Sequence, residues 1–220
     1  MGDSTYGIRT LDEESIGLAV EVIRSGRLVV IPTDTVYGVA ADPTNAEAVA
    51  RIFAAKRRPA EKSVQVLLPS LNDLRRFGLT LPAPLDALAR TFCPGGFSPI
   101  CIAEPDCPFT TVRVAENEPV SRTQGIRIPA SPATLDILAQ TGPLATSSAN
   151  LSGGQAAQTV EQAAAALGNS VALYLDGGPA PGPLASTVVA ADPKAQSGIA
   201  ILREGVVPAE ALSKALAETS

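Results

Sequence analysis

The sequence predicts an α/β domain built on a mixed sheet. Segments with helical and strand periodicity alternate along the chain, and several strand-like segments follow one another without a helix between them. The 220 residues suit one large domain or two small ones, and no internal repeat is visible. Because hydrophobic residues make up 45% of the chain, it can bury a sizeable core. We therefore interpret residues 1–220 as a single domain.

The first half of the chain predicts two helices around a short strand. Residues 11–25 read as a helix because four apolar residues between positions 16 and 23 recur at helical spacing, and Gly26 is a suitable stop. A strand over 28–31 ends at Pro32 and leads into polar residues, at the edge where open sheets bind ligands. A second helix begins at Thr44, which has capping-box spacing to Glu47, and runs out near residue 56.

The remainder alternates between short strands and helices. The further strands are expected at 63–68, 100–103, 111–114, 125–128, 144–146, 171–175, 186–190 and 199–203. The further helices are expected at 70–77, 84–92, 131–142, 159–168 and 208–217. The Pro/Gly-rich stretch 177–183 reads as a linker or as a long turn over the sheet, and the strand-like sequence on both sides favours the turn.

The composition excludes several classes of function. There is no histidine, which removes Ser-His-Asp hydrolysis, Cys-His proteolysis and HExxH zinc sites. Acidic residues outnumber basic ones by 22 to 17, and the net charge of -5 argues against a globally basic nucleic-acid binder but permits a local basic patch. Tryptophan is absent and aromatic residues are 4%, so platforms for stacking bases are few.

The cysteines and the apolar runs bear on location. Cys93, Cys101 and Cys107 are an odd number without CxxC spacing, which favours reduced thiols in a cytoplasmic protein and leaves their role open. No apolar run reaches the ~18 residues of a membrane span, and residues 1–10 lack an apolar signal core. We expect neither secretion nor membrane insertion.

Four cations stand within seven residues: Lys56, Arg57, Arg58 and Lys62. One interpretation is a solvated helix end, because cations are favourable at a helix C-terminus. The alternative is an anion site, since Pro59 and the following strand fix the backbone and these side chains suit phosphate or carboxylate oxygens.

Two polar loops and two arginines are further candidates. Residues 147–154 combine hydroxyls, an amide and two glycines, which can present N–H groups to an anion or form a plain turn. Residues 33–35, Thr-Asp-Thr, can position a small polar substrate or bond their own backbone. Arg127 and Arg203 stand at strand ends, where a surface ion pair is the alternative to a ligand contact.

Five motifs stand in a fixed order between about residues 11 and 207. They are Pro32-Thr33-Asp34-Thr35-Val36-Tyr37-Gly38; Lys56-x-Arg58 with Ser148-x-Asn150; Arg127-Ile128-Pro129 after Thr123; Ser186-Thr187-Val188-Val189; and Ile201-Leu202-Arg203-Glu204-Gly205. In this order they resemble the YrdC family, the threonylcarbamoyl-adenylate synthases of the TsaC type. Each motif is weak alone, and the order of all five makes the resemblance specific.

The resemblance implies a twisted mixed parallel and antiparallel sheet with flanking helices around a basic concave cavity. It implies synthesis of threonylcarbamoyl-AMP from L-threonine, bicarbonate and ATP, with release of pyrophosphate. A downstream tRNA threonylcarbamoyl transferase complex would then modify adenosine 37 of tRNA. ATP, carried with Mg²⁺, is a substrate, and no tightly bound cofactor is implied. Weak RNA binding stays open, and no membrane partner is implied.

The resemblance also implies roles for individual residues. ATP would be bound by Lys56, Arg58, Lys62, Thr123, Ser148, Asn150 and Arg203, with Lys56 and Arg58 catalytic. L-threonine would be held by Thr35, Arg127 and Ser186, and no resident metal site is implied. A histidine-free site suits this chemistry, because adenylyl transfer depends on alignment and on neutralised phosphate charge.

The chain departs from the resemblance in three places. Leu67 stands where a histidine is common, residues 93–98 replace a W-P-G-P-x-T region, and the extra C-terminal domain of longer relatives is absent. The first two departures leave amino-acid specificity open, so a related carbamoyl-adenylate enzyme with another acceptor is one alternative. A non-catalytic YrdC-like module that binds RNA or a nucleotide is the other, and it would need a broad basic face.

Overall fold

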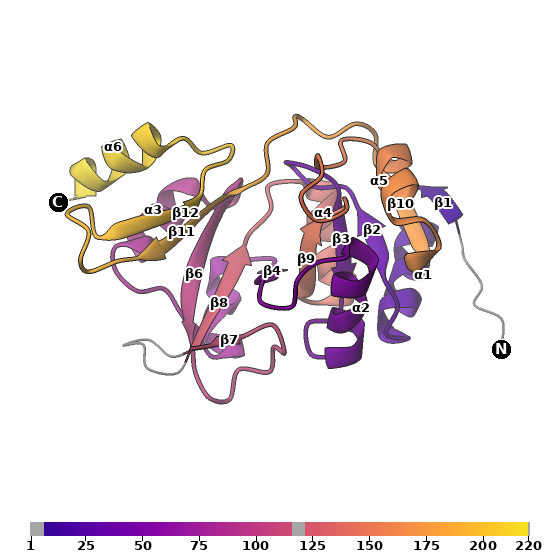
Figure 1. Cartoon of the computed structure of the whole chain (residues 1–220), viewed down its shortest axis with the longest axis horizontal. Helices are drawn as coiled ribbons and strands as arrows, with labels where there is room; N and C mark the ends of the chain where they lie inside the picture. The colour runs from indigo at the N-terminus through magenta and orange to yellow at the C-terminus, as the bar shows by residue number, and fades with distance from the viewer. Residues whose placement is uncertain (1–6, 116–121, 220) are drawn as a thin grey trace.

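Twelve strands form one sheet in the computed structural model, which describes residues 7–115 and 122–219 (Figure 1). Neighbouring strands follow the order β1-β10-β2-β3-β9-β4-β8-β6-β11-β12, with β5 paired to β6 and β7 paired to β8. The pairs β1–β10, β10–β2, β4–β8 and β6–β11 are parallel, and the other pairs are antiparallel. The predicted mixed α/β architecture is confirmed.

The elements have the following bounds. The strands are β1 (Gly7–Thr10), β2 (Val29–Ile31), β3 (Gly38–Ala41), β4 (Gln65–Leu67), β5 (Leu79–Thr80), β6 (Phe97–Ala103), β7 (Arg113–Val114), β8 (Arg122–Arg127), β9 (Leu144–Ser148), β10 (Leu173–Asp176), β11 (Thr187–Ala191) and β12 (Ile199–Arg203). The α-helices are α1 (Glu13–Arg24), α2 (Ala46–Lys56), α3 (Leu85–Phe92), α4 (Pro132–Thr141), α5 (Val160–Leu167) and α6 (Ala209–Thr219). The 3₁₀ helices are η1 (Leu71–Phe77) and η2 (Gly168–Ser170).

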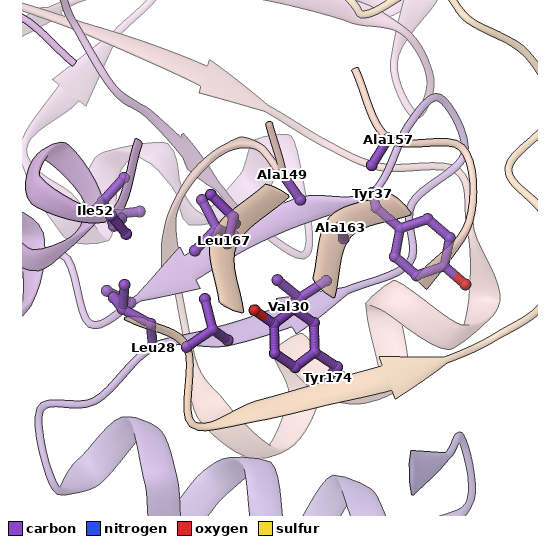
Figure 2. Close-up of a cluster of buried hydrophobic side chains, with 14 of the residues drawn as sticks. Leu28, Val30, Tyr37, Ile52, Ala149, Ala157, Ala163, Leu167 and Tyr174 are labelled. Atoms are coloured by element: carbon purple, nitrogen blue, oxygen red, sulfur yellow. The ribbon is translucent and has the colours of Figure 1, made fainter. Parts of the chain in front are cut away.

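Helices cover both faces of the sheet around β2, β9 and β10. On one face, Ile23 of α1 and Ile137 of α4 join a core cluster with strand residues. On the other face, Ile52 of α2 and Leu167 of α5 pack with Tyr174 of β10 (Figure 2). This two-sided burial explains why β2 is a continuous apolar run and not an alternating one.

The other end of the sheet has its own apolar cluster. Leu88 of α3 and Leu212 of α6 pack with Phe97 of β6 and Val189 of β11. The segment that joins β10 to β11 crosses the middle of the molecule, from one end of the sheet toward the other (Figure 1). The interpretation of residues 177–183 as a long turn over the sheet is confirmed.

Local signals predicted most helix ends correctly. Ser131 and Thr159 cap α4 and α5, and Asp12 forms a capping box with Ser15 at the start of α1. The expected cap at Thr44 is wrong: Asn45 accepts from the first amides of α2, because the Thr44 hydroxyl is bonded to Asp42. The helix expected at 70–77 is a 3₁₀ helix.

Three strands were not predicted: β1, β3 and β5, of which β5 has only two residues. Strand β3 consists of glycine, valine and two alanines, small residues that carry little strand preference. Strand β1 is mostly exposed and begins directly after residues 1–6. Those six residues belong to the stretch 1–10 that was predicted to lack an apolar signal core, and they lie outside the described residues. Pairing with β9 and β10 places β3 and β1 in the sheet, and that information is not local.

The cysteines are free, and burial raises the pKa of the Cys93 thiol to about 11. Within residues 7–115 and 122–219, no helix combines the length and the apolar character needed to cross a bilayer.

Candidate functional site

A cavity of about 340 Å³ opens over the middle strands of the sheet. Its lining comes from β4, β6, β7, β8, β9, β11 and β12 and from the loops before and after them. The cavity brings together seven of the residues that the sequence singled out: Thr35, Arg58, Lys62, Arg127, Ser148, Ser186 and Arg203. Lys56, Asn150 and Thr123 do not line it, and each is placed below.

Cationic side chains gather at this cavity. Its lining includes Arg58, Lys62, Arg113, Arg127 and Arg203, whereas Glu61 is the one acidic residue among the lining side chains that the structure describes. Burial lowers the pKa of Arg203, and the positive charges of Arg127 and Arg58 lower it further. Arg203 therefore lies within electrostatic reach of two guanidinium groups from separate parts of the chain.

Lys56 lies beneath the 147–154 loop, at the end of α2. It is 1% exposed, and its Nζ donates to the main-chain carbonyls of Ser148 and Asn150. The amide of Ser152 donates back to the carbonyl of Lys56 at 2.8 Å. Burial, with a smaller effect of the Arg58 charge, lowers the pKa of Lys56 to about 8. The interpretation of this segment as a solvated helix end is therefore wrong for Lys56.

Asn150 organises the same loop from within. Its Nδ2 donates to the carbonyls of Leu151 and Gly154 at 2.7 and 2.8 Å. Its Oδ1 is buried and has no hydrogen-bond partner among the described residues. A buried acceptor without a partner is costly, so this oxygen is a candidate for contact with water or a ligand donor.

A left-handed turn aims Arg58 into the cavity. Arg57 caps α2 with a φ of 48°, and the amides of Arg57 and Arg58 close the helix on the carbonyls of Ala54 and Phe53. The Arg58 Nη2 then donates to the carbonyl of Ser63 at 2.7 Å. Arg57 itself is exposed and is not part of the lining, so the turn separates two neighbouring cations.

Arg127 is the most enclosed cation of the site. It is 3% exposed, and its Nη1 donates to Thr35 Oγ1 at 2.6 Å while its Nη2 forms an ion pair with Asp34 at 2.6 Å. Its Nε donates to the carbonyl of Gly95. Burial lowers the pKa of Arg127, and Asp34 opposes that effect. The alternative for Arg127 was a surface ion pair. An ion pair does form, but it lies inside the protein and not at the surface.

A line of hydrogen bonds joins β12 to β4 across the cavity floor. Arg203 Nη2 donates to the Ser186 hydroxyl at 3.1 Å and to the Ser186 carbonyl at 2.7 Å. The Ser186 and Ser98 hydroxyls lie 2.8 Å apart, and Ser98 donates to Gln65 Oε1 at 2.9 Å. The alternative of a surface ion pair expected an acidic partner for Arg203. Its partners are instead the hydroxyl and the carbonyl of Ser186.

Thr123 lines a second cavity of about 490 Å³ that is contiguous with the first. The two cavities share Ser63, Ile100, Arg113 and Leu202, and the second is walled largely by apolar side chains and prolines. The two cavities thus place a polar, cationic chamber beside an apolar one.

Leu67 does not face either cavity. It is 0% exposed and packs in the core cluster beneath α1 and α4. Gln65, two residues earlier on β4, is the side chain that lines the polar cavity. The departure at Leu67 therefore lies in the core of this structure.

Sequence reasoning did not single out several polar residues of the lining, among them Gln65, Ser98 and Arg113. Gln65 and Arg113 are polar residues inside predicted strands, and such interruptions of apolar runs could have drawn attention to them. Ser98 lies in the segment 93–98, and only its pairing with Ser186 distinguishes it from an ordinary turn serine.

No group of three or more acidic or cysteine side chains that could hold a metal ion occurs among residues 7–115 and 122–219. The lining is instead a set of fixed donors. Such a set binds anions and neutralises charge that develops on phosphate or carboxylate oxygens.

Comparison with known families agrees with the order of the motifs. The sequence profile of the Sua5, YciO and YrdC proteins, described as telomere recombination, matches residues 21–205. A Bacillus subtilis protein named threonylcarbamoyl-AMP synthase is 34% identical over 190 residues, covering 85% of this chain and 53% of its own length. A Mycobacterium tuberculosis relative is 34% identical over 217 residues, covering 96% of this chain and 94% of its own length.

Solved structures share the fold. Pyrococcus abyssi Sua5, solved in complex with L-threonine, superposes with a TM-score of 0.81 at 28% identity and covers 94% of this chain. This chain spans only 59% of that Sua5 chain. Escherichia coli YciO, at 24% identity, has the same fold with a TM-score of 0.77 over 92% of this chain and 96% of its own.

Proposed function

This chain belongs to the Sua5/YciO/YrdC family, and on that premise we propose that it synthesises threonylcarbamoyl-AMP from L-threonine, bicarbonate and ATP, with release of pyrophosphate. The observation that carries the proposal is the convergence of Arg58, Arg127 and Arg203 on one cavity in an acidic chain. A cavity that gathers cations within low-dielectric walls concentrates anionic substrates and stabilises them in place.

The nucleotide occupies the part of the cavity nearest α2 and the 147–154 loop in this proposal. Arg58 and Lys62 contact the phosphates, with Arg203 across the cavity and Ser148 at the loop. Lys56 fixes the loop from below and adds a positive charge beneath it. Asn150 shapes the loop, and Thr123 lies along the apolar chamber, where the base and ribose have room.

L-threonine binds at the opposite end. Arg127 faces the substrate carboxylate, because its guanidinium retains donors beyond the bonds to Asp34, Thr35 and Gly95. Thr35 and Ser186 supply hydroxyls for the remaining polar groups of the amino acid. The related Sua5 was solved in complex with L-threonine, which supports threonine as the amino acid in this proposal.

The reaction then needs no protein nucleophile. The amino nitrogen of threonine bonds to the carbon of bicarbonate, water leaves, and a carbamate oxygen displaces pyrophosphate from the α-phosphorus of ATP. The protein aligns these groups and neutralises phosphate charge, which supplies much of the rate in such transfers. In this proposal Mg²⁺ arrives with ATP, held by its phosphate oxygens.

The product is a mixed anhydride, an activated acyl group. We propose that a tRNA threonylcarbamoyl transferase complex consumes it to modify adenosine 37 of tRNA. A cytoplasmic location suits this role, since ATP and tRNA are both found there and the cysteines are free.

Pyrophosphate release tests the proposal. The protein is incubated with ATP, Mg²⁺, bicarbonate and each amino acid in turn, and threonine-dependent release is expected. Arg58→Ala should lower the rate by roughly 10²–10³-fold, whereas Arg127→Lys should chiefly raise the KM for threonine. Faster release with another amino acid overturns the assignment of threonine as the substrate. No release with any amino acid, alongside measurable RNA binding, overturns the proposal that the protein is an enzyme.

A further inference from the structure

Strand β12 contains a β-bulge beside the cavity. In its pairing with β11, Arg203 lies opposite Val188. The next pair joins Ile201 to Val189, which leaves Leu202 as an extra residue between the two pairs. Successive side chains of a regular strand point to opposite faces of the sheet, yet Leu202 and Arg203 both line the cavity. A bulge re-aims side chains in this way, so the direction of Arg203 depends on how the end of β12 is held.

One hydroxyl holds the chain directly after the bulge. Thr187 Oγ1, on β11, accepts from the amides of Gly205 and Val207 at 2.9 and 3.0 Å and donates to the Val207 carbonyl at 2.7 Å. Because an amide N–H only donates, the single hydroxyl proton is left for the carbonyl, and these three bonds use the whole capacity of the group. Thr187 is 0% exposed, so its hydroxyl is shielded from water.

The segment held by Thr187 lies against the peptide that anchors Arg203. A Cβ at Gly205 would lie 2.7 Å from the Ser186 carbonyl oxygen, so only a glycine lets the two backbones approach this closely. That same carbonyl accepts from Nε and Nη2 of Arg203 at 3.1 and 2.7 Å. One edge of the guanidinium is therefore fixed, whereas its Nη1 has no partner among residues 7–115 and 122–219 and is available to a ligand.

In the proposed function, Arg203 contacts the phosphates of ATP from across the cavity. A charged donor has to be held in place for this task, because a displacement of about 1 Å can cost on the order of 10²-fold in rate. Thr187 does not line the cavity, so its hydroxyl acts on the site only through the backbone that it holds.

We propose that Thr187 is a positioning residue of the nucleotide site, whose hydroxyl keeps the end of β12 in the geometry that aims Arg203 at the ATP phosphates. This inference rests on the proposed function. Its signature is a selective effect on ATP, since Arg127, which is assigned to threonine, has its own partners in Asp34 and Thr35.

Kinetics with ATP and threonine varied in turn, together with calorimetric titration of ATP, test the assignment. Thr187→Val keeps the shape but removes the hydroxyl, and it should raise the Kd and KM for ATP roughly 10- to 100-fold, with the KM for threonine within about threefold of wild type. Thr187→Ser restores a hydroxyl and should return the ATP constants to within about threefold of wild type. Thr80→Val makes the same chemical change at an exposed position of β5 and should alter none of the constants.

A double-mutant cycle separates positioning from a general loss of stability. If Thr187 acts through Arg203, Thr187→Val should weaken ATP binding by less than about threefold in the Arg203→Ala background. Two losses that multiply in full would mean that the residues act independently, which overturns the proposal. An equal rise in the KM values for ATP and threonine also overturns it, because a merely structural role predicts that pattern.

Hydrogen exchange carries the test if Thr187→Val does not fold. Coupling between two sites is reciprocal, so ATP should slow exchange at the Gly205 and Val207 amides of the wild type by roughly 10- to 100-fold. The same addition to Arg203→Ala should leave these amides unchanged. Exchange in the wild type that is the same with and without ATP overturns the assignment.

The outcomes distinguish this proposal from the proposed function. A wild-type protein that binds no ATP overturns both. A wild-type protein that binds ATP but releases no pyrophosphate overturns the proposed reaction, and the ATP affinities of the variants then decide on Thr187. An active wild-type protein whose ATP constants are unchanged in Thr187→Val overturns the assignment of Thr187 alone.

Discussion

The Nζ of Lys56 lies 2.6 Å from the main-chain carbonyl oxygen of Asn150, a residue 94 positions later in the chain. This contact, with the one to the Ser148 carbonyl, ties the end of α2 to the loop after β9. The two halves of the KxR and SxN pairing are therefore one physical unit, in which the lysine supports the loop and the arginine faces the cavity.

Lys56→Ala should abolish most activity through the loop. Removing the ammonium takes from the buried Asn150 carbonyl the donor that Lys56 supplies, and it takes one donor from the Ser148 carbonyl, which still accepts from the Asn150 amide. We expect a loss of roughly 10²–10³-fold in kcat/KM for ATP. Arg57→Gly is the matched control, because it removes the neighbouring exposed cation at a φ of 48° that glycine prefers. Its activity should stay near wild type, and equal losses in both variants would contradict the separate roles.

Stability should depend on pH through Lys56. Its pKa is lowered from 10.5 to about 8, so between these values the unfolded chain binds more protons than the folded one. The free energy of unfolding contributed by this group therefore rises with pH across that window, as the cost of a buried charge is relieved. Urea unfolding of wild type and Lys56→Met on either side of the window measures it. A difference between the two proteins that is independent of pH would exclude the effect.

Gly205 should tolerate no side chain. A Cβ there would lie 2.1 Å from the carbonyl oxygen of Ala185, a backbone atom that cannot swing away. Gly205→Ala should cost ~1–3 kcal/mol in the free energy of unfolding and disturb the Arg203–Ser186 contact. Gly182→Ala, where nothing lies within 4 Å, is the control and should be neutral or stabilising by ~0.4–1 kcal/mol. Thermal unfolding of both variants measures the difference.

Leu67 should matter for stability and not for substrate choice. Leu67→Ala leaves a void in the core and should cost ~2–5 kcal/mol in urea unfolding. The ratio of kcat/KM for threonine over serine should stay unchanged, because Leu67 lines neither cavity. Leu184→Ala, at a side chain that is 55% exposed, should change neither quantity appreciably. A shifted ratio in Leu67→Ala would return this position to the substrate site.

Local sequence predicted the parts of the fold that local chemistry decides. Ser131 before Pro132, and Thr159 three residues before Gln162, mark helix starts because the hydroxyl satisfies a free amide at that spacing. The choice between Thr44 and Asn45 was decided by Asp42, which occupies the threonine hydroxyl. No spacing rule contains that competition.

The candidate site was predictable in its inventory and not in its geometry. Charged and polar motifs identified Arg58, Arg127 and Arg203, since such residue types suit anions wherever they converge. Whether a lysine faces the ligand or supports a loop depends on how the end of α2 packs against the loop after β9, as Lys56 shows. Gln65 stands inside a predicted strand, and only the assembled sheet shows that it lines the cavity.

Strand β10 lies between β1 and β2 and runs parallel to both, although those two strands come from the first 31 residues and β10 from residues 173–176. During synthesis on a ribosome, β1 and β2 therefore cannot pair with β10 until the late part of the chain has been made. Contacts of such long sequence separation slow folding, and until they form, an unpaired edge invites association with other chains. The synthesis of this protein thus has a vulnerable interval, which ends only when residue 176 has left the exit tunnel.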